Sequence, residues 1–297
     1  MKCKTLVFAL LCFSLWNCQT SSPLASLEQQ IKDELAQVEG IFAVAFKNLD
    51  TGEEILINAR DSFHAASTMK TPVLIELYKQ AATGQFNLSD SIIIKNEFKS
   101  IVDGSPYSMS IDDDSEGKLY NAIGSKSTIA DLAYDMIIYS SNLATNILID
   151  LVDARQVTQT MRELGAPDIQ VLRGVEDIKA FEKGLSNSTT AFDLMAIYEK
   201  LALKQVVSEK ASEEMIDILL DQKFNEIIPA HLPKDVKVAH KTGVITGVHH
   251  DSGIVFLPDG RKYVLVLLSR ALGDFDQGTA KMAEVSRIIY DYVTLRR

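Results

Sequence analysis

The stretch VKVAHKTGVITGVHHDSGIVFLPDGRKYVLVLLS, residues 236–269, is the part of the sequence that decides the fold. Apolar segments rich in β-branched residues alternate here with short polar breaks, a pattern typical of strands. Three strands are predicted, at Val236–His240, Gly253–Leu257 and Lys262–Ser269. The turn Pro258-Asp259-Gly260 joins the last two.

Strand signals recur near the amino terminus, where Ile41–Asn48 and Glu54–Asn58 flank the hairpin turn Asp50-Thr51-Gly52. Between the two groups of strands the sequence has mostly helical periodicity. Helices are predicted at about 24–39, 69–82, 128–152, 189–204, 209–222 and 277–292. The economical fold class is α/β with an additional all-α lobe. One antiparallel sheet is built from both chain ends with flanking helices, and the central residues form a helical domain.

Two lobes follow from this arrangement. Residues 23–65 and 230–297 are assigned to the α/β lobe, and residues 66–229 to the helical lobe. We expect the active site in the cleft between the lobes, since ligand sites favour such clefts. The polar segment 96–127 is expected to be an exposed loop or hairpin.

The composition excludes several classes of protein. The chain has 297 residues, of which 46% are hydrophobic, enough for one large globular unit or two closely packed lobes. Its net charge is −10 with no Lys/Arg-rich block, which argues against a nucleic acid partner. The five histidines show neither His-x-His nor His-Glu-x-x-His spacing, so neither a metal nor a cofactor is expected. We expect a monomer.

Residues 1–22 are predicted to be a signal peptide. Two early lysines precede the apolar run Leu6–Trp16, which is too short to span a bilayer as a mature helix. We therefore expect an exported, periplasmic protein. All three cysteines lie in this leader, so the body has no disulfide framework. A lipid anchor at Cys18 and simple cleavage of the leader both remain open.

The pattern Ser-x-x-Lys occurs twice, beginning at Ser67 and at Ser115. Ser115 lies in an acidic loop, whereas Ser67 opens a predicted helix whose Pro72 fits only near a helix start. Ser67 and Lys70 would lie one turn apart on the same face, so the amine can reach the hydroxyl. The N–H groups at a helix start also favour developing negative charge. Taken alone, the pattern also fits a Ser67 that is only a helix N-cap.

Two further motifs carry polar groups suited to the same site. Ser140-Ser141-Asn142 interrupts an apolar helical pattern, and such a break can aim a hydroxyl and an amide into a cleft. Lys241-Thr242-Gly243 follows a predicted strand, where the glycine lets a ligand approach and the other two residues can bind a carboxylate. Taken alone, the first motif fits a plain helix–loop–helix junction better, and the second fits an ordinary edge-strand lysine better.

In this order, Ser-x-x-Lys, Ser-x-Asn and Lys-Thr-Gly resemble the signature of β-lactamases and penicillin-binding proteins. The chain is most similar to the class A serine β-lactamases, over roughly residues 24–296. The resemblance implies that Ser67 attacks the carbonyl of a β-lactam substrate, with Lys70 as its proton partner. Ser140 would then pass a proton to the leaving nitrogen.

The resemblance also assigns residues that bind the substrate. Asn142 would orient the amide side chain of the substrate, and Lys241 and Thr242 would hold its carboxylate. The oxyanion would sit between the backbone N–H groups of Ser67 and Val244, beside Gly243.

A deacylating glutamate is also implied, on a loop after the second motif. Glu176, in the run Leu172–Asp177, lies where the resemblance places it. A surface carboxylate, or a shift of one residue to Asp177, stays open. Three features depart from the family pattern. Ser141 and Ala180 replace a usual Asp and Asn, and no arginine lies near His249–Ser252.

The sequence therefore predicts a serine β-lactamase that acts through a Ser67 acyl-enzyme, which water activated by Glu176 releases. The alternative is a penicillin-binding D-Ala-D-Ala carboxypeptidase or transpeptidase, which shares the acylating residues. A catalytically inactive sensor would lack Ser67 or Lys70, and both are present.

Overall fold

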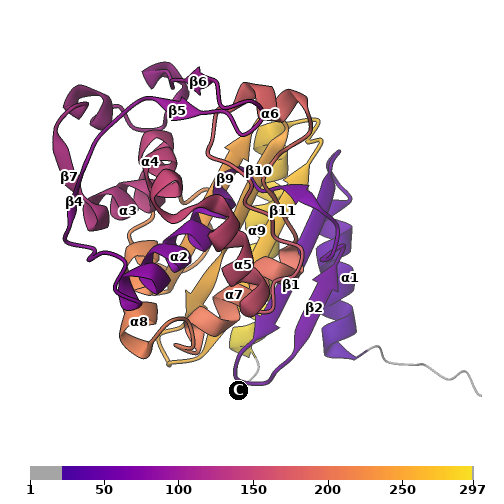
Figure 1. The fold of residues 1–297 in the computed structure, drawn as a ribbon. Helices are drawn as coiled ribbons and strands as arrows, with labels where there is room; N and C mark the ends of the chain where they lie inside the picture. The colour runs from indigo at the N-terminus through magenta and orange to yellow at the C-terminus, as the bar shows by residue number, and fades with distance from the viewer. Residues whose placement is uncertain (1–21, 296–297) are drawn as a thin grey trace, which may run out of the picture.

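The computed structural model describes residues 22–295, and the predicted signal peptide with Cys18 lies outside the described residues. A five-stranded antiparallel sheet with strand order β2-β1-β11-β10-β9 forms the centre (Figure 1). Its strands are β1 (Ile41–Asn48), β2 (Glu54–Ile57), β9 (Lys237–Ile245), β10 (Val248–Phe256) and β11 (Lys262–Arg270). The prediction of one sheet built from both chain ends is confirmed.

Helices cover both faces of this sheet. The terminal helices α1 (Pro23–Leu35) and α9 (Phe275–Leu295) contact each other on one face (Figure 1). The other helices are α2 (Lys70–Ala82), α3 (Ile129–Ile138), α4 (Asn142–Val152), α5 (Ala154–Glu163), α6 (Ile178–Glu182), α7 (Ala191–Ala202) and α8 (Glu209–Leu220). Within residues 22–295, no helix is long and apolar enough to cross a membrane.

Alternation along β1 explains why both faces are covered. Phe42, Val44 and Phe46 belong to the apolar cluster that includes α1 and α9, whereas Ala43 and Ala45 belong to the cluster of the central helices. Successive side chains of a strand point to opposite faces, so a strand buried on both sides is apolar throughout. The small alanines leave room for α7, which contacts β1, β10 and β11.

The boundary between the two lobes stays a prediction. Helix α7 falls within the interval assigned to the helical lobe, yet it lies on the sheet. One apolar cluster also joins residues of the sheet to the central helices without interruption.

Short elements complete the described chain. Three two-stranded pairs are β3 (Phe63–His64) with β8 (Ser188–Thr189), β4 (Ser91–Ile93) with β7 (Lys126–Thr128), and β5 (Phe98–Lys99) with β6 (Pro106–Tyr107). The 3-10 turns are η1 (Ala66–Met69), η2 (Ile111–Asp113) and η3 (Leu119–Ala122). The segment 96–127 therefore contains the expected hairpin, which is β5–β6.

Two predictions about the elements need correction. The motif Lys241-Thr242-Gly243 lies inside β9 rather than after it, because β10 begins at Val248 and pairs with β9 as far as Ile245. Helix α5 was not predicted. It is polar apart from a narrow stripe that buries Val157 and Met161.

Candidate active site

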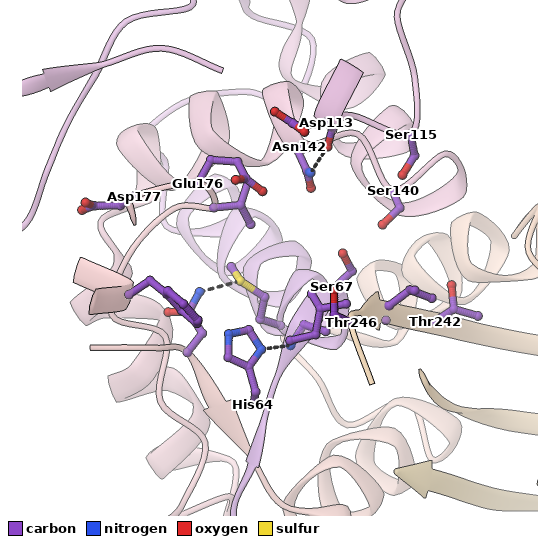
Figure 2. A pocket seen from close by; sticks show the side chains of 18 of the residues that line it. His64, Ser67, Asp113, Ser115, Ser140, Asn142, Glu176, Asp177, Thr242 and Thr246 are labelled. Atoms are coloured by element: carbon purple, nitrogen blue, oxygen red, sulfur yellow. Dashed lines mark hydrogen bonds between the residues drawn. The ribbon is translucent and has the colours of Figure 1, made fainter. Parts of the chain in front are cut away.

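A cavity of about 690 Å³ opens between β9, the start of α2 and the break between α3 and α4 (Figure 2). The predicted site residues that line it are Ser67, Ser140, Asn142, Glu176, Thr242, Gly243 and Val244. Lys70 and Lys241 are fully buried and hydrogen-bonded to Ser140 in the cavity wall. The structure therefore brings all the predicted site residues to one place.

Ser67 lies in η1, one turn before α2, rather than on the α-helix itself. The residue before it, Ala66, has a φ of +43°, an uncommon conformation for a side chain with a Cβ. Its N–H donates to His64 Nδ1 at 3.0 Å, and His250 Nε2 donates to His64 O at 2.9 Å. Burial lowers the pKa of His64, which keeps Nδ1 available as an acceptor. Met69, not Ser67, occupies the N-cap position of α2, so the N-cap interpretation of Ser67 is wrong.

The two lysines converge on Ser140. Lys70 Nζ donates to Ser140 O at 2.7 Å, to Ser140 Oγ at 3.1 Å and to Asn142 Oδ1 at 2.9 Å. Lys241 Nζ donates to Ser140 Oγ at 3.1 Å and to Thr242 O at 2.9 Å. Within residues 22–295, no hydrogen bond joins Lys70 Nζ to Ser67 Oγ, so the direct contact expected from helical spacing is replaced by one with Ser140.

Burial controls the protonation of both lysines. It lowers the pKa of Lys70 to about 7, although the carboxylates of Asp114 and Glu176 act in the opposite direction. Burial and the neighbouring charge of Lys70 together hold the pKa of Lys241 well below its ordinary value. Near neutral pH, Lys70 can therefore both accept and donate a proton.

The backbone break between α3 and α4 aims Ser140 at the lysines. Ser140 has a φ of +56°, and Ser141 caps α4 by accepting the N–H of Ala144 at 3.3 Å. Asp114 supplies a second cap, because its carboxylate accepts the N–H groups of Asn142 and Leu143, each at 2.9 Å. No sequence signal pointed to Asp114, because nothing distinguishes it from the other two aspartates in the run 112–114.

Gly243 lets β9 approach the backbone of Ser67. A Cβ built on Gly243 would lie 2.9 Å from Ser67 N, a distance that real Cβ atoms essentially never show, and 3.1 Å from Thr68 N, which is tighter than most. Glycine at this position therefore lets the strand bring the adjacent Val244 close to the nucleophile. The side chain of Val244 is exposed at the cavity.

Glu176 lies in the wall of the cavity with a φ of +60°. Figure 2 shows its carboxylate turned toward Asn142, whereas the carboxylate of Asp177 points away. Burial, with a contribution from Asp113, raises the pKa of Glu176. A carboxylate with a raised pKa accepts protons more readily than an exposed one.

Asn146 fixes the loop that carries Glu176. Its Oδ1 accepts the N–H of Val175 at 2.6 Å, and its Nδ2 donates to Val175 O at 3.0 Å. A Cβ on Gly174 would lie 2.3 Å from Asn146 Oδ1, so glycine is required at this contact. The sequence held one signal for Asn146, which is a polar residue one turn after Asn142 in an apolar helix.

The model of the β-lactamase enzyme family matches residues 26–293. This chain belongs to that family.

One relative and two solved structures illustrate the similarity. The β-lactamase PER-1 of Pseudomonas aeruginosa is 23% identical over 290 residues, covering 94% of this chain and 91% of its own. PBP-A is 26% identical with a TM-score of 0.79, covering 92% of this chain and 97% of its own. A class A β-lactamase of Bacteroides cellulosilyticus has 22% identity and a TM-score of 0.76, covering 93% and 99%, and supports the fold.

Two of the departures from the family pattern, Ser141 and Ala180, have defined places in the structure of this β-lactamase family member. Ser141 caps α4, a role that serine fills as well as aspartate. Ala180 is buried and apolar, while Asn187 holds the loop instead, accepting the N–H groups of Leu172 and Arg173 at 2.8 and 3.2 Å.

Arg173 and His240, near this β-lactamase site, already have hydrogen-bond partners within the protein. Arg173 lines the cavity, but its guanidinium donates to the carbonyls of Leu185 and Gly174. His240 and Asp251 form a buried pair at 2.8 Å. Among residues 22–295, no three His, Cys, Asp or Glu side chains are grouped as a metal site would require.

Proposed function

We propose that this chain is an exported class A-type serine β-lactamase. It opens the β-lactam amide through an acyl-enzyme on Ser67, and water activated by Glu176 releases the product. The observation that carries this proposal is the single hydrogen-bond network of Lys70, Ser140 and Lys241 beside Ser67, with Glu176 in the same cavity wall. Such an activity gives resistance to β-lactam antibiotics.

Acylation requires a proton to leave Ser67 and another to reach the β-lactam nitrogen. Lys70 in its neutral form accepts the first proton, and Ser67 Oγ forms the ester as the C–N bond breaks. Ser140 Oγ accepts hydrogen bonds from both lysines, so its own O–H is free to donate to the departing nitrogen. Lys70 then returns a proton to Ser140, which balances the step.

The negative charge on the carbonyl oxygen needs donors placed before the reaction begins. The N–H groups of Ser67 and Val244 are the proposed donors, which the close approach at Gly243 permits. Asn142 is held on both sides, by Lys70 and by the Asp113 carbonyl at 3.2 Å, and would present its amide to the substrate side chain.

The substrate carboxylate would be held by Lys241 and Thr242, beside Ser140, whose Oγ accepts a hydrogen bond from Lys241 Nζ. Lys241 is buried, which lowers its pKa, and a carboxylate entering the cavity would raise that pKa again and favour the charged amine.

Replacing Lys241 by Ala is expected to lower kcat/KM for carboxylate-bearing β-lactams at least about tenfold, since a charge-assisted hydrogen bond contributes about 1.5–3 kcal/mol. The measurement compares a penicillin with its carboxyl ester, for which the loss should be smaller. Lys237→Ala, an exposed lysine on the same strand, is the control. A Lys241→Ala variant within about twofold of wild type would exclude this role.

The acidic limb of the kcat/KM profile is expected near pH 7, because only neutral Lys70 can accept the Ser67 proton and burial lowers its pKa to about 7. Removing the Asp114 charge with Asp114→Asn lowers that pKa further. The limb should therefore move to lower pH by about one unit.

Steady-state kinetics between pH 5 and 9 measures this limb, with Asp112→Asn, an exposed neighbour, as the control. Glu176 and Lys241 are the other charged groups near Lys70 and are unchanged in both variants. If the acidic limb of the profile does not move in Asp114→Asn, a group other than Lys70 determines that limb.

The alternative function is a penicillin-binding peptidase, and the similarity to PBP-A favours it as the second candidate. A mutant of PBP-A has been solved as an acyl-enzyme complex with penicillin G. Purified wild-type protein distinguishes the two functions with a chromogenic cephalosporin. A lactamase gives many turnovers, whereas a penicillin-binding peptidase gives one equivalent of colour and then stops.

We also propose that residues 1–22 direct export to the periplasm and that the mature protein is monomeric. The mass of the mature protein separates the two fates of the leader, because a lipid anchor leaves a diacylated Cys18 and simple cleavage does not.

A further inference from the structure

The loop that carries Glu176 is attached to the β5–β6 hairpin by a buried carboxylate. Asp177 is only 2% exposed, and two of its three hydrogen-bond donors come from the hairpin. Ser100 Oγ donates to Asp177 Oδ1 at 2.8 Å, and Ile101 N donates to Oδ2 at 2.9 Å. The third donor is Ala180 N, at 3.2 Å from Oδ1, so the same carboxylate also caps α6.

A second link lies on the other side of Glu176. Tyr107 Oη, at the end of β6, donates to Val175 O at 3.2 Å. Val175 is also held by Asn146, so the residues immediately before and after Glu176 are both fixed. Glu176 itself has a φ of +60°, a conformation that persists only where its surroundings impose it.

The remaining contacts between hairpin and loop come from Lys179 and are exposed. Lys179 Nζ donates to Ser105 Oγ at 2.6 Å and pairs with Asp103 at 2.9 Å, and the Lys179 and Asp103 side chains are about half exposed, at 52% and 48%. Exposed pairs of this kind add little, because water screens them. The hydrogen bonds from Ser100 and Ile101 to the buried Asp177 carboxylate are therefore the principal link between loop and hairpin, beside the single bond from Tyr107.

We propose that Asp177 is a positioning residue for deacylation. Through Ser100 and Ile101 it uses the β5–β6 hairpin to keep the Glu176 carboxylate in the cavity wall. This inference rests on the proposed β-lactamase function. It also replaces the possibility that Asp177 is itself the base, since its carboxylate points away from the cavity (Figure 2).

Asp177→Asn tests the role. In wild type the carboxylate accepts hydrogen bonds from the Ser100 hydroxyl and from two backbone N–H groups. In the variant the NH₂ group of the amide would face a donor instead of accepting from it. Ser100→Ala removes one donor and leaves Asp177 charged, which guards against a variant that fails to fold. Asp103→Asn weakens the exposed ion pair of the same hairpin and is the matched control. All three are made in the full chain and assayed with a penicillin well below their unfolding temperatures.

A loop displaced by about 1 Å costs about 10²-fold in rate, so kcat of Asp177→Asn should fall about that much. In the proposed mechanism Lys70 is the base for acylation and Glu176 the base for deacylation, so KM should fall in parallel and kcat/KM should stay within about threefold of wild type. Intact-protein mass spectrometry should show the variant mostly acylated at steady state. Ser100→Ala should show the same pattern more weakly, and Asp103→Asn should match wild type.

A loss of kcat/KM at unchanged KM would overturn the inference, because general damage to the site would then explain the effect. Wild-type kinetics in both Asp177→Asn and Ser100→Ala would overturn it as well. A wild-type protein that itself stays acylated would overturn both this inference and the proposed function. Hydrolysis by wild type with an unaffected Asp177→Asn would overturn this inference alone.

Discussion

The Glu176→Gln variant is expected to accumulate an acyl-enzyme that wild type does not. The ester on Ser67 is stable unless a water beside it loses a proton as it attacks. Glu176 is half-buried in the cavity wall with a raised pKa, so its carboxylate can accept that proton. Loss of a general base lowers rates about 10²–10⁴-fold, and kcat should fall within this range.

Rapid mixing with a penicillin, followed by acid quench and intact-protein mass spectrometry, measures the acylated fraction. Glu182→Gln, an exposed carboxylate at the end of α6, is the control and should turn over normally. The rate of acylation, read from the same time course, shows whether Glu176 also assists the first step. Normal turnover by Glu176→Gln would exclude it as the base for deacylation.

The Ser67→Ala variant is expected to lose at least about 10⁴-fold in kcat, because removal of a nucleophile leaves only binding and oxyanion stabilisation. Substrate binding should persist, since Asn142, Thr242 and Lys241 are unchanged. Hydrolysis of a chromogenic cephalosporin measures the loss, and equilibrium binding of an unreacted penicillin measures what remains.

Ser115→Ala is the matched control for this loss. Ser115 begins the other Ser-x-x-Lys pattern and is exposed at the rim of the same cavity. Its replacement should leave kcat within about twofold of wild type. If Ser115→Ala is inactive and Ser67→Ala retains activity, the choice between the two patterns is wrong.

The sheet was predictable because burial on both faces makes long apolar strands. Strands β1 and β11 are apolar over nearly their whole lengths. Residues 241–243 of β9 and 249–252 of β10 were not predictable in this way, because most of them are polar and yet buried. His250 and Asp251 are satisfied there by His64 and His240, partners that the sequence alone does not place beside them.

The site was predictable in outline for a different reason. Three short motifs in a fixed order identify the chemistry, and the structure gathers them around one cavity. The contacts by which other residues hold those motifs in place were not predictable, even for Asn146, whose polarity in an apolar helix singles it out. Asp114, Asn146 and Asp177 act through backbone groups of distant segments, and any carboxylate or amide of suitable length would look the same in the sequence.

The central claim is that Ser67 carries the acyl group during turnover, and peptide mapping tests it most directly. Wild type and Glu176→Gln are mixed with a penicillin, quenched in acid, digested and sequenced by mass spectrometry. The account predicts the full mass of the opened penicillin on the peptide that contains Ser67, lasting in Glu176→Gln and disappearing from wild type as product forms. An adduct on another residue such as Ser115, or hydrolysis without an adduct in either protein, would contradict it.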